Sequence, residues 1–267
     1  MQNFNYHTHT YRCRHADYSM SDEDYVKELI KKGFKRIAFT DHMPDKEGID
    51  SRTYMRMDYS EKEGYLNSVK YLREKYKDVI EIETGFEVEY LPGREKYLFD
   101  LKNEVDKIVL GQHYIYAEDN KSLKIFRHNE FSDEDLIKYA SYIDMAMKNN
   151  IPDIIVHPDI YMLSREKFGE AEAKVAHMIC QSAEKYDIPL EINLTEIQLY
   201  LIGRKNKISY PSKEFWDIAT NYDIRVLYGI DAHFKDQIEM YEECIEYTNE
   251  YIGKEKIKKL NFIKNIE

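Results

Sequence analysis

The chain has 267 residues, of which 39 are basic and 50 are acidic, and its formal net charge is −11. This surplus of negative charge argues against binding long nucleic acid, because the phosphate backbone attracts basic surfaces. Hydrophobic residues make up 43% of the chain, enough for a full core. No apolar run approaches the roughly 18 residues that a membrane-spanning helix needs, so we expect no membrane partner.

Three widely spaced cysteines, Cys13, Cys180 and Cys244, form no CxxC motif and cannot all pair with one another. The first ten residues lack the basic and apolar regions of a signal peptide. Both observations indicate a reducing, cytoplasmic location. The sequence leaves the oligomeric state open.

Apolar runs typical of strands alternate with charge-rich helical segments along the whole chain. The first strand is expected at 3–6, and a helix follows Ser21, which lies three residues before Asp24 as in a capping box. The later strands are expected at 36–40, 79–83, 107–110, 153–156, 189–192 and 225–228. The later helices are expected at 61–76, 95–102, 133–148, 170–186 and 212–221, with more helix near the end of the chain.

These strand–helix units follow one another without a linker rich in proline, glycine or serine. Alternating units predict a parallel sheet, and seven of them favour a closed or nearly closed barrel. We therefore expect a single domain over residues 1–267, with an α/β fold of the TIM-barrel type. Residues 43–60 are expected to form a long loop, and residues 117–130 a loop or hairpin.

Two histidines, His7 and His9, follow the first strand and lie two residues apart. Residues i and i+2 of a strand point the same way, so both imidazoles can bind one metal ion. Taken alone, the pair could equally be solvated. The other histidines near strand ends are His15, His42, His113, His157 and His233. In a parallel barrel these strand ends share the face where active sites lie.

Two acidic residues, Glu87 and Asp231, occupy equivalent positions after the third and seventh strands. With the seven histidines they make nine candidate ligands, too many for one ion with four or five bonds. We expect two or three ions, with Glu87 as a bridge because a carboxylate has two oxygens. Mixed imidazole and carboxylate ligands suit zinc, iron or manganese better than magnesium or calcium.

The motifs YHTHT, FTDH, GFE, GQH, VHPD and GIDAH occur in this order at strand ends. Together they resemble the polymerase and histidinol phosphatase (PHP) family over nearly the whole chain, and most of all its monofunctional histidinol-phosphatase branch. The further likenesses to that branch are Cys13-Arg14-His15, His157 with Asp159 and then residues 165–169, and Glu191-Ile192-Asn193 with residues 203–205 and 210–212.

The resemblance implies a distorted (β/α)7 TIM-like barrel with three metal ions at the carboxyl ends of the strands. Carried over motif by motif, the first ion is held by His7, His9, Glu87 and Asp231. The second is held by Glu87, His113 and His157, and the third by His15, His42 and His233. The segment Leu194–Ile202 departs from the family, because it is longer than the link expected before the arginine at 204.

The resemblance also implies hydrolysis of a small phosphate monoester, with L-histidinol phosphate, a compound of histidine biosynthesis, as the expected substrate. Clustered cations lower the pKa of a bridging water toward about 7 and neutralise charge on the phosphoryl oxygens. Asp231 and His233 are candidates for proton transfer and complete the expected catalytic set with Glu87. The general acid stays unassigned.

Four residues are candidates for substrate binding. Arg165 and Arg204 follow the fifth and sixth strands, and guanidinium groups bind phosphate in a forked geometry, although each alone is more often a surface charge. Asp17 is a candidate for a substrate ammonium group, and could as easily be solvated. His128 is a candidate for the pocket wall, with placement on the surface as the alternative.

Three other functions remain open from the residues. An amidohydrolase also begins with HxH, but that family favours a bridging lysine or carboxylate after the fourth strand, where this chain has His113. A PHP phosphoesterase acting on a nucleotide or another small phosphate is a second alternative. A metal-loaded domain without catalysis is a third, although such a domain would be expected to have lost ligands.

Overall fold

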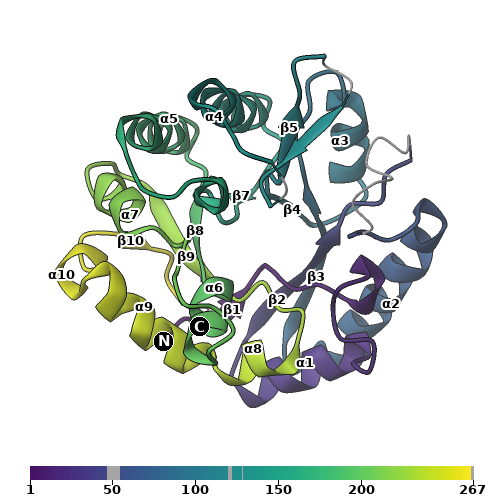
Figure 1. Cartoon of the computed structure of the whole chain (residues 1–267). Coiled ribbons are helices and arrows are strands. Elements are labelled where there is room, and N and C mark those ends of the chain that lie inside the picture. Colours follow the sequence, from purple (N-terminus) through teal and green to yellow (C-terminus); the bar gives the residue numbers. More distant parts are fainter. Residues whose placement is uncertain (47–54, 120–121, 128, 266–267) are drawn as a thin grey trace.

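The computed structural model describes residues 1–46, 55–119, 122–127 and 129–265. Eight parallel strands form one curled sheet in the order β1-β2-β3-β4-β7-β8-β9-β10, with helices around its outside (Figure 1). The strands are β1 (Phe4–Asn5), β2 (Arg36–His42), β3 (Glu81–Val88), β4 (Lys107–Leu110), β7 (Ile154–Ile155), β8 (Leu190–Asn193), β9 (Arg225–Gly229) and β10 (Asn261–Phe262). This distorted half-barrel is the fold expected from the sequence, although β10 was not expected.

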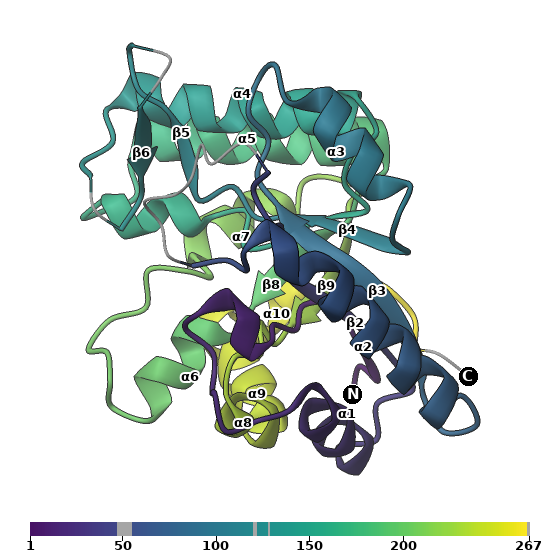
Figure 2. The same ribbon diagram turned by 90° about the vertical axis from the view of Figure 1, so that its right-hand side faces the viewer.

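Most of the helices lie around the outside of the curled sheet, whereas α6 (Thr195–Leu201) lies inside their ring in Figure 1 and on the left in Figure 2. The helices are α1 (Asp22–Lys31), α2 (Lys62–Tyr76), α3 (Glu95–Lys102), α4 (Asp133–Lys148), α5 (Glu170–Tyr186), α6 (Thr195–Leu201), α7 (Lys213–Ala219), α8 (Lys235–Glu239), α9 (Tyr241–Ile252) and α10 (Lys254–Ile257). Short 3-10 turns lie at Tyr11–Cys13, Tyr59–Glu61 and Ile160–Ser164. Within the described residues, no helix combines the length and apolar character needed to cross a bilayer.

Alternation along the strands separates the core into two parts. In β2, Ile37 and Phe39 belong to the large cluster shared with the helices, whereas Ala38 belongs to a small cluster with Leu227 of β9 and Val109 of β4. Because successive side chains of a strand point to opposite faces, the small cluster fills the inside of the curl. The same alternation turns acidic residues of β3 and β8 inward near the carboxyl ends of these strands.

An antiparallel hairpin, β5 (Tyr114–Tyr116) and β6 (Leu123–Ile125), follows β4. It stands beside α4 on the left of Figure 2, and α6 lies lower on the same side. Phe126 anchors the end of the hairpin, since its ring stacks on Phe131 with centroids 4.2 Å apart. The sequence left a loop or a hairpin open here, and the structure has the hairpin.

The first and ninth strands meet along a seam that is closed by backbone pairing only at its carboxyl end. There the amide of His9 donates to the carbonyl of Ala232 at 2.9 Å, and the amide of Ala232 donates to the carbonyl of His7 at 3.2 Å. At the other end β10 pairs with β9, and the side-chain amide of Gln2 donates to the carbonyl of Tyr228 at 2.7 Å. The seam therefore brings the start of the chain against the residues after β9.

Candidate metal centre

Glu87 occupies the middle of the centre, facing inward from β3, and it is only 1% exposed. Its Oε1 lies 2.9 Å from Nε2 of His157 and 3.5 Å from Nε2 of His113. Its Oε2 lies 2.9 Å from Nδ1 of His42. The two oxygens thus face different imidazoles, as a bridging carboxylate requires.

A first group of ligand candidates comes from the two sides of the seam. Oδ1 of Asp231 lies 3.4 Å from Nε2 of His7 and 3.1 Å from Nε2 of His9. Nε2 of His9 also lies 3.5 Å from Oε2 of Glu87. The side chains of His7 and His9 are fully buried, so water does not satisfy these nitrogens.

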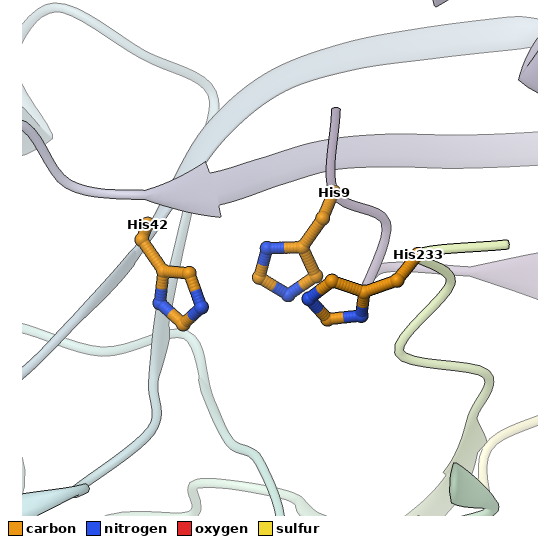
Figure 3. A group of neighbouring side chains, drawn as sticks. All are labelled: His9, His42 and His233. Atoms are coloured by element: carbon orange, nitrogen blue, oxygen red, sulfur yellow. The ribbon is translucent and has the colours of Figure 1, made fainter. Parts of the chain in front are cut away.

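A second cluster of imidazoles lies on the other side of His9. Figure 3 shows the rings of His9, His42 and His233 turned toward one another from three different segments. The centroids of His9 and His233 are 4.1 Å apart, and His15 lies 4.4 Å from His233. One ligand atom from each of His9, His42 and His233 falls within 4.8 Å of the others. This spacing suits a shared ion.

Contacts on the outer side of the rings fix their orientation. Nδ1 of His15 donates to the carbonyl of Cys13 at 2.8 Å, and Nδ1 of His233 donates to the carbonyl of Asp231 at 2.9 Å. Because a carbonyl only accepts, the proton of each ring lies on Nδ1 and a lone pair remains on Nε2. This leaves the second nitrogen of each ring able to bind a metal ion.

Buried carboxylates have the same role for two other imidazoles. Nδ1 of His7 lies 3.0 Å from Oε2 of Glu191, and Nδ1 of His113 lies 2.9 Å from Oε1 of Glu89. Glu191 and Glu89 are each 1% exposed. Carboxylate–histidine pairs of this kind orient metal ligands in many proteins.

Electrostatics favours ionised carboxylates at the centre and shifts the pKa values of its imidazoles in both directions. Burial opposes ionisation of Glu87, but the charges of His42 and His113 lower the pKa of that carboxyl well below its usual value. Burial and the charge of His9 lower the pKa of His15 to about 4, and the same two causes lower the pKa of His233. Burial opposes protonation of three other rings, but nearby carboxylates outweigh it and raise the pKa of His7, His9 and His113. A divalent ion that binds these rings must therefore displace their protons.

Buried atoms without a hydrogen-bond partner test the fit of this donor set to a metal. Among the described residues these atoms include His7 Nε2, both ring nitrogens of His9, His42 Nδ1, His233 Nε2 and Glu87 Oε2. A buried polar atom without a partner costs about 1–3 kcal/mol, and so many converging on one point would be strongly unfavourable. Divalent metal ions satisfy them, and the residues present fit such ions.

A cavity of about 660 Å³, part of it open to solvent, lies against the centre. The ligand candidates that line it are His15, His42, Glu87, His113, His157, Asp231 and His233. The rest of its lining is Met55, Arg56, Glu89, Tyr114, Ile125, Phe126, Arg127, Ile160, Leu163 and Tyr210. A volume of this size suits a small-molecule ligand.

The arginines expected from sequence to bind substrate lie elsewhere. Nε of Arg165 donates to Glu172, and its NH2 group donates to Asp133 at 2.7 Å, so its guanidinium holds α4 and α5 together outside the cavity lining. Arg204 is exposed and also absent from the lining. The segment Leu194–Ile202, expected as a loop, contains α6, and Arg204 follows this helix.

The two remaining candidates are not brought to the centre either. The carboxylate of Asp17 accepts hydrogen bonds from the amide and hydroxyl of Ser19, and Asp17 does not line the cavity. His128 lies outside the described residues. The sequence pattern did not predict Arg56 and Arg127 as cavity residues or Glu191 as a partner of His7. The alternation of inward- and outward-facing side chains along β8 could have indicated Glu191, whereas nothing in the strand-end pattern indicates Arg127.

Curated and solved proteins resemble this chain over most of its length. A protein of Deinococcus radiodurans, named a probable histidinol-phosphatase, is 22% identical over 237 residues, covering 85% of each chain. A candidate histidinol phosphatase of Listeria monocytogenes has a solved structure with a TM-score of 0.73 and 21% identity, covering 88% of this chain and 97% of the other.

A second solved structure is that of histidinol phosphate phosphatase from Lactococcus lactis, in complex with zinc, L-histidinol and phosphate. It has a TM-score of 0.66 and 17% identity, covering 100% of this chain and 97% of the other. At these identities the two structures support the fold. A model of the PHP domain family matches residues 5–195.

Proposed function

This chain belongs to the PHP domain family, and from this premise we propose that it is a metal-dependent phosphoric monoester hydrolase that converts L-histidinol phosphate to L-histidinol and phosphate. The relatives named for this activity support the substrate. The observation that carries the proposal is the convergence of nine histidine and acidic side chains, with unpartnered buried atoms, beside a cavity of small-molecule size.

The proposed cofactors are two or three divalent transition-metal ions, namely zinc, iron or manganese. We assign His7, His9, Glu87 and Asp231 to the first, Glu87, His113 and His157 to the second, and His15, His42 and His233 to the third. When bound, such ions activate water and neutralise the charge that develops on the phosphoryl group. Glu87 and Asp231 both have a pKa well below the usual value, because neighbouring histidines outweigh the effect of burial.

The chain's own residues supply the orientation and proton transfer that hydrolysis needs. The water oxygen forms a bond to phosphorus while the ester bond to the alcohol breaks, so one proton must reach the leaving oxygen. Asp231 and His233 line the cavity and are the proposed carriers of that proton. Nε2 of His233 is buried and has no hydrogen-bond partner within the described residues. Because the same nitrogen is assigned to the third ion, it can accept a proton only when that ion is not bound, and Asp231 is the proposed carrier in the fully loaded site.

The amidohydrolase alternative is not favoured by the geometry. In the structure the acidic residue between the imidazoles is Glu87 of β3, whereas the residue after β4 is His113, whose Nε2 points to Glu87 at 3.5 Å. A bridging group supplied after the fourth strand, as that family favours, is therefore not present in this described part of the site.

Phosphate release by the metal-loaded protein tests the proposal. We expect kcat/KM for L-histidinol phosphate to exceed the values for mononucleotides and simple sugar phosphates. The Glu87→Gln variant should lose activity against every ester. A higher kcat/KM for a nucleotide would move the assignment to the nucleotide phosphoesterase alternative. No release from any ester would leave the domain as a metal-binding module.

A further inference from the structure

The cavity contains two guanidinium groups, and they differ in their partners. The NH2 group of Arg56 donates to both carboxylate oxygens of Glu89, at 3.1 and 3.2 Å, and its NH1 group donates to the carbonyl of Met43 at 2.9 Å. Arg56 therefore holds Glu89 behind His113. Arg127 also lines the cavity, but within the described part of the chain no carboxylate pairs with it.

The backbone around Arg127 is held firmly although its side chain is exposed. The amide of Phe126 donates to the carbonyl of His113 at 3.3 Å, and the buried ring of Phe126 packs edge-on against Tyr139 at 5.0 Å. The amide of Ile125 donates to the side-chain oxygen of Asn129 at 2.8 Å, and the amide of Asn129 donates to the carbonyl of Ile125 at 3.0 Å. These contacts hold Ile125, Phe126 and Asn129 in place, so the backbone beside Arg127 is anchored next to the cavity.

The charge of Arg127 reaches the interior of the cavity. Burial raises the pKa of the Tyr210 phenol, and the guanidinium of Arg127 opposes this rise through its charge and a side-chain hydrogen bond. The nearby Lys205 differs, because it is paired with Glu196. In a chain with a net charge of −11, a cavity cation that has no acidic partner among the described residues is the group that an anion would meet.

We propose that Arg127 is the anion anchor of this cavity and binds the phosphoryl oxygens of the substrate and of the product phosphate. The proposal rests on the proposed function for its substrate, and it assigns the phosphate contact to the β5–β6 hairpin in place of Arg165 and Arg204. A guanidinium forms two parallel, charge-assisted hydrogen bonds to a phosphate. One such contact corresponds to about a 10- to 100-fold change in affinity.

Three variants distinguish the effect of the Arg127 charge, the effect of its guanidinium geometry and a general effect on folding. Arg127→Met keeps a long side chain but removes its charge. Arg127→Lys keeps the charge but removes the planar guanidinium that can form two parallel hydrogen bonds. Arg225→Met is the matched control, because Arg225 is 44% exposed at the first residue of β9 and pairs with Asp187. Binding of inorganic phosphate to metal-loaded protein is measured by calorimetry, and KM and kcat for L-histidinol phosphate are measured alongside, with thermal unfolding as a check.

We expect Arg127→Met to weaken phosphate binding and raise KM by about 10- to 100-fold, with an unchanged unfolding temperature. Arg127→Lys should lie between this variant and the wild type, and Arg225→Met should match the wild type. Unchanged phosphate affinity in Arg127→Met, or no phosphate binding by the wild type, would overturn the proposal. If phosphate binds through Arg127 but L-histidinol phosphate is not hydrolysed, the anchor stands and the proposed function falls.

Discussion

Imidazoles in this centre use their two ring nitrogens for different purposes. Nδ1 of His7 contacts a buried carboxylate while Nε2 faces Glu87 and Asp231. The carboxylate partner, Glu191, also accepts a hydrogen bond from the side-chain amide of Asn193 at 2.8 Å. His7 is therefore held in one orientation by residues that are not themselves ligand candidates.

The variant Glu191→Gln should lower metal affinity by about 10- to 100-fold, as for other carboxylates that orient a ligating histidine. The amide fills the same space, but it binds the Nδ1 proton of His7 less strongly than a carboxylate does. Competition with a coloured chelator measures the affinity. Glu250→Gln is the control, because Glu250 is 63% exposed and pairs only with Lys254 among the described residues. Equal affinity in Glu191→Gln and wild type would show that His7 needs no such support.

Two carboxylates away from the centre should change stability with pH in opposite directions. Burial raises the pKa of Glu83, and Lys107, with Nζ 3.7 Å from Oε2, offsets this only in part. The folded chain thus holds the Glu83 proton more tightly than the unfolded chain, so this stabilisation is present below the usual pKa and is lost as pH rises through the raised one. Glu83→Gln should therefore gain free energy of unfolding relative to wild type as the pH rises above the usual glutamate pKa of about 4.5.

Asp106 provides the opposite case and serves as the control. Burial opposes its ionisation, but hydrogen bonds from Thr84 and Arg73 lower its pKa. Its contribution is present above the usual pKa and is lost as pH falls through the lowered one. Asp106→Asn should therefore be less stable than wild type at neutral pH, with a smaller difference in acid. Urea unfolding of metal-free protein measures both differences, and a common sign for the two would contradict this explanation.

Glycines at the ends of two strands leave space for buried carboxylates of the centre, because they have no side chain. A Cβ atom at Gly111, just after β4, would lie 1.8 Å from Oε1 of Glu87 and 2.8 Å from Cε1 of His157. A Cβ atom at Gly229, the last residue of β9, would lie 2.0 Å from Oε2 of Glu191. The strand backbones therefore approach the buried acids more closely than any other residue type allows.

Gly111→Ala should disrupt the centre while leaving the barrel folded. The added methyl group must displace Glu87 and His157, so we expect loss of bound metal and of activity. Metal content per chain and the far-ultraviolet circular dichroism spectrum measure the two effects. Gly64→Ala is the control, since nothing lies within 4 Å of a Cβ there and the site is inside α2, where alanine should add about 0.5–1 kcal/mol of stability. Full metal occupancy in Gly111→Ala would contradict the prediction.

Periodicity predicted the larger elements well, and three helices have the expected bounds: α3, α4 and α5. It failed where an element is too short to show a pattern, as in the two residues of β10. The segment Leu194–Ile202 is longer than the link that the family resemblance implies, and its pattern is too short to predict that it contains α6. The convergence at strand ends was predictable because parallel strands share one rim. The position of Arg127 in the cavity was not predictable in this way, because Arg127 follows a hairpin that is not part of the strand-end rim.

Metal binding should contribute strongly to the stability of the whole chain. Many buried polar atoms of the centre have no hydrogen-bond partner within the described residues. The folded chain should therefore be less stable without metal than with it. A ligand that binds only the folded state at 1,000 times its Kd adds about 4 kcal/mol. Chelation should lower the thermal unfolding temperature, and zinc or manganese should restore it. An unchanged unfolding temperature after verified metal removal would contradict this expectation.

Ions bound at the seam would connect the beginning of the chain to the residues that follow β9. His7 and His9 stand near the beginning of the chain, whereas Asp231 and His233 follow its ninth strand, so an ion held between them joins two distant points of the polypeptide. A cross-link that closes a long loop removes much of the conformational freedom of the unfolded chain. The cysteines of this protein are unpaired, so ions bound as we propose would provide the reversible cross-link between the two ends of the chain that a disulfide does not.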